Sequence, residues 1–586
     1  MVVATLLSGA AGVAWGLGAP APASSKSQEE NGQIHVKNPK TAKGGSAAEG
    51  IKAPWVIQEN AKPGTTDWRL APNRSKGSID GYADKVSAQQ GDRVTLFVST
   101  DAPNYRVEAY RIGYYGGLGG RQIWKSPTLP GSKQAKPDRE SGTNMIEAKW
   151  TPSLTVPITG AWPEGDYLFK LVASTGPQRY MPLTIRDDRS TAAFVVQNSV
   201  TTWQAYNLWG GYDLYEGKNS SGGSDFDHRS RVVSFDRPYT LGDGAADFLA
   251  NEFPLVSLVE SLGLDVTYWT DLDLHERGSL LAKHKALLSL GHDEYWSRTM
   301  RDNAVAGRER GVNIAFFGAN AVFRHIRLEP SRLGPDRHQV DYKRAREDPF
   351  YGKNNKEVTS DWRAAPVSEP ESNLIGDLYE CNPVKADMVV ADANTWVFAG
   401  TGLSRGDRLY KVVGPEYDRY DPRAPGPPNV QVLTHSPLRC GGTSSYSNMT
   451  YYTARSNAGV FATGTNWWIS KLSQDCPPDV TYTCPKDAVV KITTNVLDAF
   501  GAGPAGVAHP STATNLKSLP TGLPDSTDTS DTLMPRRRTT RTTYYYQQPQ
   551  PQPRATYTPP PTYTYTPPPT YYYTPPPTRP RGLLGR

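Results

Sequence analysis

A histidine and a carboxylate stand two residues apart in the run Gly291-His-Asp-Glu-Tyr-Trp296, which follows an apolar pentapeptide. His292 and Glu294 are residue types that bind metal ions, or that act together as a base and its orienting partner. In the alternative without chemistry, the histidine caps the next helix or satisfies a buried carbonyl group. An isolated His-x-Glu pair favours that alternative, so the chemical interpretation depends on whether other polar residues reach the same place.

Polar residues also follow three other apolar runs of the chain. Asn198 and Tyr206 follow the run at 192–196, Asp271 and Asp273 follow the run at 266–269, and Asn320 follows the run at 312–317. Taken alone, Tyr206 is more often a core tyrosine, and Glu416, in a Gly/Pro loop, is more often a surface carboxylate. Asn198, Tyr206, Asp271, Asp273 and Asn320 are therefore of interest for their shared position after apolar runs.

No competing nucleophile or nucleotide motif is found. The sequence has no Gly-x-Ser-x-Gly in a strand–turn–helix context, no phosphate loop and no dinucleotide fingerprint. No cysteine falls between residues 190 and 340, so a thiol amidotransferase mechanism lacks its nucleophile.

The elements that must position these residues are short buried strands that alternate with helix-like stretches. We expect strands at 192–196, 266–269, 286–290 and 312–317, and helices at 245–262 and 297–310. Such alternation is typical of a parallel sheet, whose ligands bind off the carboxyl ends of its strands. The histidine, carboxylates, amide and phenol are thus predicted to converge on one crevice.

The rest of the body divides by pattern. Residues 54–188 show period-two alternation, for example at 93–99, 105–111 and 165–172, which predicts an Ig-like β-sandwich. Residues 189–510 are expected to form the α/β domain with inserted strands, closed by a helix at 487–500. Polar segments at 26–53 and 511–534 are expected to be linkers.

The net charge of +6 belongs to the C-terminal segment. Residues 535–586 hold eight arginines and no lysine or acidic residue; subtracting that +8 from the total leaves −2 for residues 1–534. A nucleic-acid-binding body is therefore not expected. The segment also has 14 prolines and nine tyrosines, which predicts a disordered or polyproline II tail. It would serve as an inert spacer, or contact a cell wall or another protein.

Residues 1–25 carry no charge and end in an Ala/Pro/Ser stretch, which resembles a secretory signal segment. We therefore expect a secreted or cell-surface protein. The four cysteines are even in number, so Cys476 is expected to pair locally with Cys484, and Cys381 with Cys440. A zinc site is not expected, because no close Cys-x-x-Cys pair exists.

The segments 201–211, 234–238, 290–296, 317–320 and 414–416 together resemble the N,N-dimethylformamidase large (beta) subunit family. The resemblance covers roughly residues 54–505. It implies an amide hydrolase with a mononuclear iron held by two tyrosines and a glutamate. It also implies an α/β domain like that of the glutamine amidotransferases, but without their cysteine.

Carried over residue by residue, the resemblance assigns the iron to Glu294 and Tyr206, with Tyr215 or Tyr239 as the second tyrosine. Glu416, His292 and Asn320 match the catalytic positions. The protein is then an exported, metal-dependent hydrolase of carbon–nitrogen amide bonds in small amide or peptide-like substrates.

Two alternatives remain open at this stage. One is a non-catalytic surface or cell-wall-associated binding protein on a degenerate hydrolase fold. The other is a carbohydrate-directed enzyme with paired carboxylates such as Asp271 and Glu294.

Overall fold

The computed structural model describes residues 51–71, 78–473, 485–511, 514–515 and 519. All of these belong to the compact unit of residues 47–586. The signal-like segment, most of the expected linkers at 26–53 and 511–534, the tail at 535–586 and the pair Cys476–Cys484 lie outside the described residues. Where these linkers are described they pack on the body: Ile51 and Ser511 are buried, and Asn515 accepts from the Val432 amide at 2.9 Å. No helix in the described part of the chain has both the length and the apolar character needed to cross a membrane.

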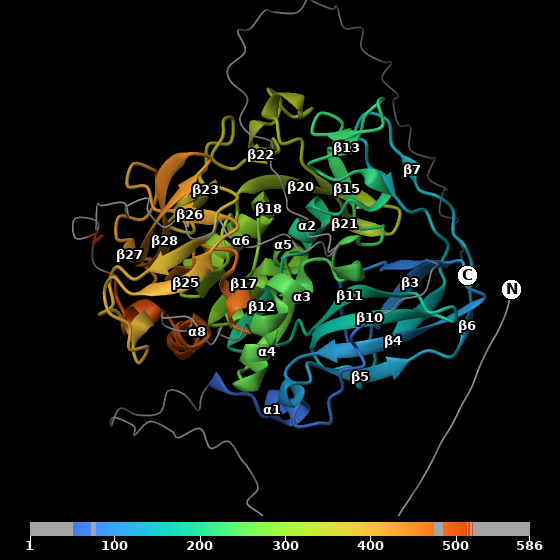
Figure 1. Ribbon diagram of the computed structural model, residues 1–586, viewed down its shortest axis with the longest axis horizontal. Helices are drawn as coiled ribbons and strands as arrows, with labels where there is room; N and C mark the ends of the chain where they lie inside the picture. The colour runs from blue at the N-terminus through green and yellow to red at the C-terminus, as the bar shows by residue number, and fades with distance from the viewer. Residues whose placement is uncertain (1–50, 72–77, 474–484, 512–513, 516–518, 520–586) are drawn as a thin grey trace, which may run out of the picture. The chain divides into compact units, whose positions relative to one another are not determined.

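Two mostly antiparallel sheets make up residues 79–186, as their alternating sequence predicts (Figure 1). The first consists of β1 (Ile79–Ala83), β3 (Arg93–Thr100) and β9 (Leu154–Pro157). The second consists of β2 (Ser87–Gln89), β11 (Gln178–Arg186), β10 (Gly165–Ala173), β4 (Asn104–Ile112) and β5 (Gly120–Lys125), with β6 (Leu129–Pro130) beside β4. Leu96, Val107 and Phe169 belong to one apolar core shared by these strands.

A seven-stranded sheet forms the centre of the following part of the chain. Its order is β16 (Val266–Thr270), β12 (Phe194–Asn198), β17 (Ala286–Leu290), β19 (Asn313–Phe317), β29 (Gly459–Ala462), β28 (Thr443–Thr453) and β27 (Gln431–Cys440). The first five strands are parallel, and β28 and β27 are antiparallel additions. The four predicted strands are thus confirmed as neighbours in a parallel sheet, with every residue of all four buried.

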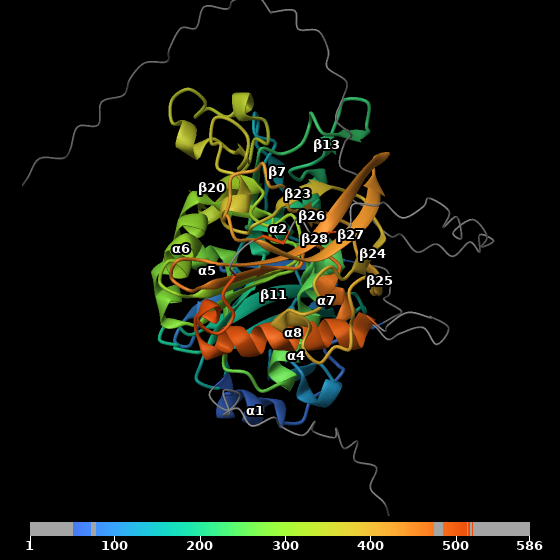
Figure 2. The ribbon, with the colours of Figure 1, turned by 90° about the vertical axis from the view of Figure 1, so that its left-hand side faces the viewer.

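Helices that connect or cover the central sheet are α2 (Val200–Ala205), α5 (Asp271–Arg277), α6 (Arg298–Arg308), α7 (Trp468–Lys471) and α8 (Pro485–Ala502). The helices at 297–310 and 487–500 are confirmed. Ser297 caps α6, because its Oγ accepts from the amide of Met300 at 3.1 Å. Buried side chains of α8, such as Val489 and Phe500, belong to the same apolar core as the sheet, and Asn313 Nδ2 donates to the Phe500 carbonyl at 3.0 Å. In Figure 2, α8 runs below β28 and β27.

The prediction of a single helix at 245–262 is wrong in one respect, because the chain forms two short helices there. They are α3 (Phe248–Asn251) and α4 (Phe253–Ser261). Pro254 has no amide hydrogen to donate inside a helix, so it lies in the first turn of α4 and a break precedes it.

Smaller sheets surround the carboxyl ends of the central strands. One contains β15 (Val232–Ser234), β21 (Gly334–Val340), β20 (Arg324–Ser331), β18 (Tyr295–Ser297) and β22 (Ser360–Asp361). Two-stranded sheets pair β7 (Asp138–Arg139) with β8 (Ile146–Glu147), β13 (Gly217–Lys218) with β14 (Ser224–Asp225), β23 (Leu378–Cys381) with β26 (Tyr417–Arg419), and β24 (Ala386–Val389) with β25 (Arg408–Val413). Strands β20 to β26 of these sheets all lie between β19 and β27 in the chain.

A buried ion pair joins the N-terminal sheets to α4. The guanidinium of Arg111, in β4, donates to both carboxylate oxygens of Glu260, and neither side chain is exposed. Tyr268, in β16, donates to the same carboxylate at 2.5 Å. This pair fixes the position of β4 against the helix and strand that frame the central sheet.

Cys381 and Cys440 form a disulfide with Cα atoms 6.3 Å apart, which confirms this pairing. The bond closes a loop of 59 residues. A loop of that length lowers the entropy of the unfolded chain enough to stabilise the fold by about 4 kcal/mol. We expect C381S/C440S to lose about that much free energy of unfolding in urea, with a larger m-value because the unfolded chain without the cross-link exposes more surface. A loss below about 1 kcal/mol would show that the bond constrains little.

Candidate active site

Three oxygen-bearing side chains from different segments meet near the carboxyl end of β17. Glu294 follows the turn after β17, Tyr206 ends α2, and Tyr215 lies in the loop after α2. Tyr206 Oη donates to Glu294 Oε2 at 2.6 Å and lies 2.7 Å from Tyr215 Oη. Tyr215 Oη lies 3.1 Å from Glu294 Oε1. Two phenols and a carboxylate therefore form a compact oxygen triangle.

Tyr215, rather than Tyr239, is the second tyrosine of this triangle. The ring of Tyr239 packs edge-on against Trp203 with 6.2 Å between ring centroids. The ring of Tyr215 stacks on Tyr206 with 4.6 Å between centroids. The sequence left both tyrosines as candidates, and the packing separates them.

His292, Glu416 and Asn320 form a second cluster that touches the first. His292 Nε2 lies 3.2 Å from Glu294 Oε2 and 3.0 Å from Glu416 Oε2. Asn320 Nδ2 donates to Glu416 Oε2 at 3.0 Å. Six residues that the resemblance assigned to the iron or to catalysis, including Glu416 from a distant loop, thus gather in one place. The carboxylates of Asp271 and Asp273 accept instead from Thr201 and Thr270.

Close approach of two strand ends makes this convergence possible. Gly291 has φ +57°, and a Cβ there would lie 2.7 Å from the Asn251 carbonyl oxygen. A Cβ at Gly318 would lie 1.7 Å from the Gly291 carbonyl oxygen. The turns after β17 and β19 therefore require glycine, since any side chain would push His292 and Asn320 apart.

Charges around Glu294 decide its ionisation. Burial alone would raise its pKa, but the hydrogen bond and charge of His292, with the charges of Lys343 and Arg324, lower it to about 2. For His292, burial lowers the pKa, and the facing carboxylates of Glu416 and Glu294 raise it well above its usual value. The imidazole is therefore held as a cation between two carboxylates.

The phenols of the triangle are held in the neutral form. Burial, and then the charge of Glu294, raise the pKa of both Tyr206 and Tyr215 well above the ordinary value. A bound cation would reverse this preference, because phenolate ligands pair with positive charge. Metal binding at the triangle would therefore release protons.

Tyr295 and Lys343 belong to the site but were not predicted. Tyr295 Oη donates to Tyr215 Oη at 2.6 Å, and Lys343 Nζ donates to Tyr295 Oη at 2.6 Å. Burial lowers the pKa of Lys343 to about 7. Tyr295 stands next to Glu294 in the sequence, which is a usable signal. No sequence signal marks Lys343, which the pairing of β21 with β20 brings in from 48 residues away.

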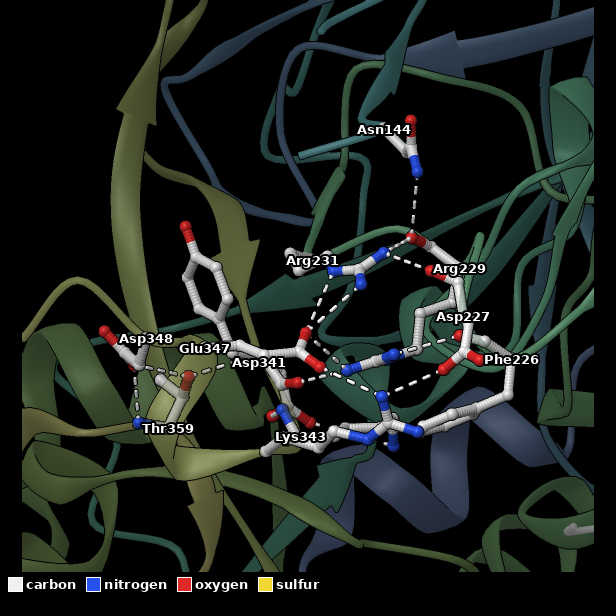
Figure 3. Close-up of polar contacts among 12 residues, drawn as sticks. Asn144, Phe226, Asp227, Arg229, Arg231, Asp341, Lys343, Glu347, Asp348 and Thr359 are labelled. Carbon is white, nitrogen blue, oxygen red and sulfur yellow. Dashed lines mark hydrogen bonds and ion pairs between the residues drawn. The ribbon is translucent and has the colours of Figure 1, made fainter. Parts of the chain in front are cut away.

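The segment that carries Lys343 is anchored by a cluster of arginines around Glu347 (Figure 3). Arg229, Arg231 and Arg344 each donate to the Glu347 carboxylate at 3.1 Å. Arg229 also lies over the ring of Phe226, 4.0 Å from its centroid. One carboxylate thus accepts from three guanidinium groups and helps to hold 341–348 in place.

Glu347→Ala should therefore destabilise the fold, because it leaves the fully buried Arg229 without its counter-charge. We expect a loss of about 2–3 kcal/mol in the free energy of unfolding, less than for a fully buried pair because Glu347 is partly exposed. Urea denaturation measures it. Glu329→Ala is the matched control: its carboxylate is half exposed and 3.8 Å from Arg327, so its effect should stay below about 1 kcal/mol. Equal effects of the two variants would contradict the anchoring role.

A metal at the triangle would depend on the phenols. Within the ranges that the structure describes, no three His, Cys, Asp or Glu side chains form a group suited to a metal ion. Oxygen ligands about 2.0–2.1 Å from one cation in octahedral geometry lie roughly 3 Å from one another. The oxygen separations in the triangle match that spacing, and hard oxygen donors suit ferric iron. The residues present therefore fit the implied iron.

Comparison with known proteins gives one extensive match. The sequence pattern described as "N,N-dimethylformamidase beta subunit-like, C-terminal" matches residues 106–479. No curated protein matches the chain. Among solved structures, an uncharacterized protein from Bacillus anthracis str. Ames is 12% identical, covering 18% of this chain and 82% of its own, with a TM-score of 0.12. A structure of the bacterial superantigen toxic shock syndrome toxin-1 is 15% identical, covering 19% and 99%, also with a TM-score of 0.12. Likenesses this low carry no conclusion.

Proposed function

The chain belongs to the N,N-dimethylformamidase beta subunit-like family, and from that premise we propose that it hydrolyses carbon–nitrogen amide bonds. The observation that carries the proposal is the contact between two clusters. The oxygen triangle of Tyr206, Tyr215 and Glu294 lies one hydrogen bond from the charged pair of His292 and Glu416.

Tyr206, Tyr215 and Glu294 would hold the iron. When bound, ferric iron would act as a Lewis acid toward an amide carbonyl and would lower the pKa of water. The protonated imidazole of His292 lies beside the triangle. Its positive charge limits how much further positive charge the site accepts. Glu294 is shared between His292 and the phenols, so it links the metal ligands to the proton-transfer groups.

Glu416 is assigned the role of general base. Its Oε2 is occupied by His292, Asn320 and Asn466, whereas among the described residues Oε1 accepts only from Asn382. Oε1 therefore keeps an open lone pair that can take a proton from the attacking water. The same carboxyl group can then pass that proton to the departing amine, as amide hydrolysis requires.

Asn320 is assigned to the nitrogen side of the substrate. Its Nδ2 is used by Glu416, while its buried Oδ1 has no hydrogen-bond partner among the described residues. A free amide oxygen accepts hydrogen bonds, so it suits the N–H of a primary or secondary amide, or of the amine product. An oxyanion would be repelled by that oxygen.

A series of amides that differ only in nitrogen substitution tests the proposal. We expect turnover, and we expect kcat/KM for an amide with an N–H to exceed that for its N,N-dialkyl analogue by roughly tenfold or more, because a buried acceptor would otherwise stay unpaired. Elemental analysis should find iron, and Glu294→Gln should lose both iron and turnover. A metal-free protein without turnover, unchanged by Glu294→Gln, would refute an amide hydrolase.

The surroundings of the site fit the same proposal. We assign an Ig-like β-sandwich to residues 54–188 and a glutamine-amidotransferase-like α/β domain to 189–510, which is supported by the paired antiparallel sheets and by the parallel central sheet. We further propose that the protein is secreted or attached to the cell surface. The disulfide is consistent with an oxidising compartment.

A further inference from the structure

Asn382 is the only described partner of the Glu416 oxygen that faces the reaction. Asn382 Nδ2 donates to Glu416 Oε1 at 2.9 Å, and it also donates to Tyr379 Oη at 2.9 Å. The other carboxylate oxygen is held by groups from three other segments, His292, Asn320 and Asn466. Among the described residues, Asn382 alone therefore holds Oε1 and opposes rotation of the Glu416 carboxylate about its Cγ–Cδ bond.

The position of Asn382 depends on the short strand β23, which ends one residue before it. β23 pairs only with β26, and its register shifts between Tyr379 and Cys381, which places Cys381 opposite Tyr417. Glu380, on the same strand, accepts from Arg419 and from Ser445, both at 2.6 Å. Other noncovalent contacts also hold β23: Arg363 donates to the Tyr379 carbonyl at 2.8 Å, and the Tyr379 ring packs edge-on against Phe323 with 5.1 Å between ring centroids.

The disulfide is the covalent link, and it ends one residue before Asn382. Cys381 is bonded to Cys440, which is buried at the end of β27, an edge strand of the seven-stranded sheet. A rigid sheet is thereby tied to the residue that precedes the amide contact to Glu416. Cys381 itself is only partly buried, so a small thiol can reach its sulfur.

We propose that Asn382 is a positioning residue for Glu416, and that the Cys381–Cys440 disulfide holds it in place, so that reduction of this bond lowers activity. The inference rests on the proposed function, because it assigns Glu416 the base. A dithiol is the reductant. Its thiolate attacks Cys381 Sγ and the S–S bond breaks to a mixed disulfide; its second thiol then releases Cys381. Two electrons and two protons end on Cys381 and Cys440, and the dithiol becomes a cyclic disulfide.

Kinetics of three variants test the contact. For Asn382→Ala we expect kcat to fall by at least about tenfold with KM changed less than about twofold, since the amide acts on the base and not on substrate affinity. Asn382→Asp, which places a second carboxylate against Oε1, should fall further. Asn382→Gln, which keeps the donor on a longer arm, should recover part of kcat. Equal kcat in wild type and Asn382→Ala overturns the positioning role, and so does a loss expressed only in KM.

The disulfide is tested by reduction. Treatment with a dithiol, or C381S/C440S, should lower kcat to about the level of Asn382→Ala, and reoxidation of the wild type should restore it. C476S/C484S is the matched control and should keep both full activity and the response to dithiol. If kcat is the same before and after reduction of Cys381–Cys440, the proposed regulation is refuted.

Hydrogen exchange separates this inference from the proposed function. Reduction should raise amide exchange in 378–382 and in 415–419, whatever the substrate is. If no amide is turned over but exchange rises in both segments, the hydrolase assignment fails and the link between the disulfide and Glu416 stands. If exchange in 415–419 is unchanged by reduction, the link itself is refuted.

Discussion

Tyr215→Phe is expected to lower the affinity of the protein for ferric iron by at least about 100-fold, because it removes one of the three proposed oxygen ligands while keeping the ring that stacks on Tyr206. Iron retained per chain after dialysis measures the loss. The visible absorption of an iron–phenolate pair gives a second readout, independent of activity.

Tyr239→Phe is the matched control for that experiment. Its ring packs on Trp203 away from Glu294, so iron content and absorption should equal those of the wild type. Retention of iron in Tyr215→Phe together with loss in Tyr239→Phe would reverse the assignment of the second tyrosine. Retention in both would remove tyrosine from the ligand set.

Glu416→Gln is expected to lower kcat by roughly 10²–10⁴-fold, the range that general acid–base catalysis supplies. The amide keeps the shape of the side chain but cannot take the proton of the attacking water. Iron content should be unchanged, because Glu416 reaches the oxygen triangle only through His292. Steady-state kinetics and elemental analysis on the same preparation measure both.

Glu369→Gln makes the same chemical change on the surface and serves as the control. Glu369 is 44% exposed and pairs with Arg298 at 3.2 Å, so its variant should keep kcat within about twofold. A Glu416→Gln enzyme with wild-type kcat would exclude Glu416 as the base. A parallel loss of iron would show that the residue acts through the metal ligands instead.

The parallel strands and most of the site follow from local sequence. The strand at 286–290 is predicted to the residue, because five apolar or small residues stand between turn signals. His292, Glu294 and Asn320 follow their strands directly, so the convergence of parallel strand ends predicts that they meet. Glu416 entered the prediction through the family motif, because no strand precedes it in the pattern.

Residues that reach the site through long-range pairing could not be found in this way. Lys343 follows β21, and its contact with Tyr295 depends on how β20 packs against β18. Asn382 and Asn466 are ordinary loop asparagines in the sequence, and only the pairing of β23 with β26 and the position of β29 bring them to Glu416. The break before α4 was missed because the apolar periodicity runs through Pro254.

The order of strands in the central sheet has a consequence for biosynthesis. β29 lies next to β19, although about 140 residues separate them in the chain. At ribosomal rates of 5–20 residues per second, the edge of β19 stays unpaired for roughly 7–30 seconds while the intervening segments are made. The unpaired edge of a strand whose residues are all buried in the folded protein can pair with another chain and lead to aggregation. The nascent chain therefore passes through a stage in which a chaperone would be of most use, and the site is assembled only after residue 466 has emerged.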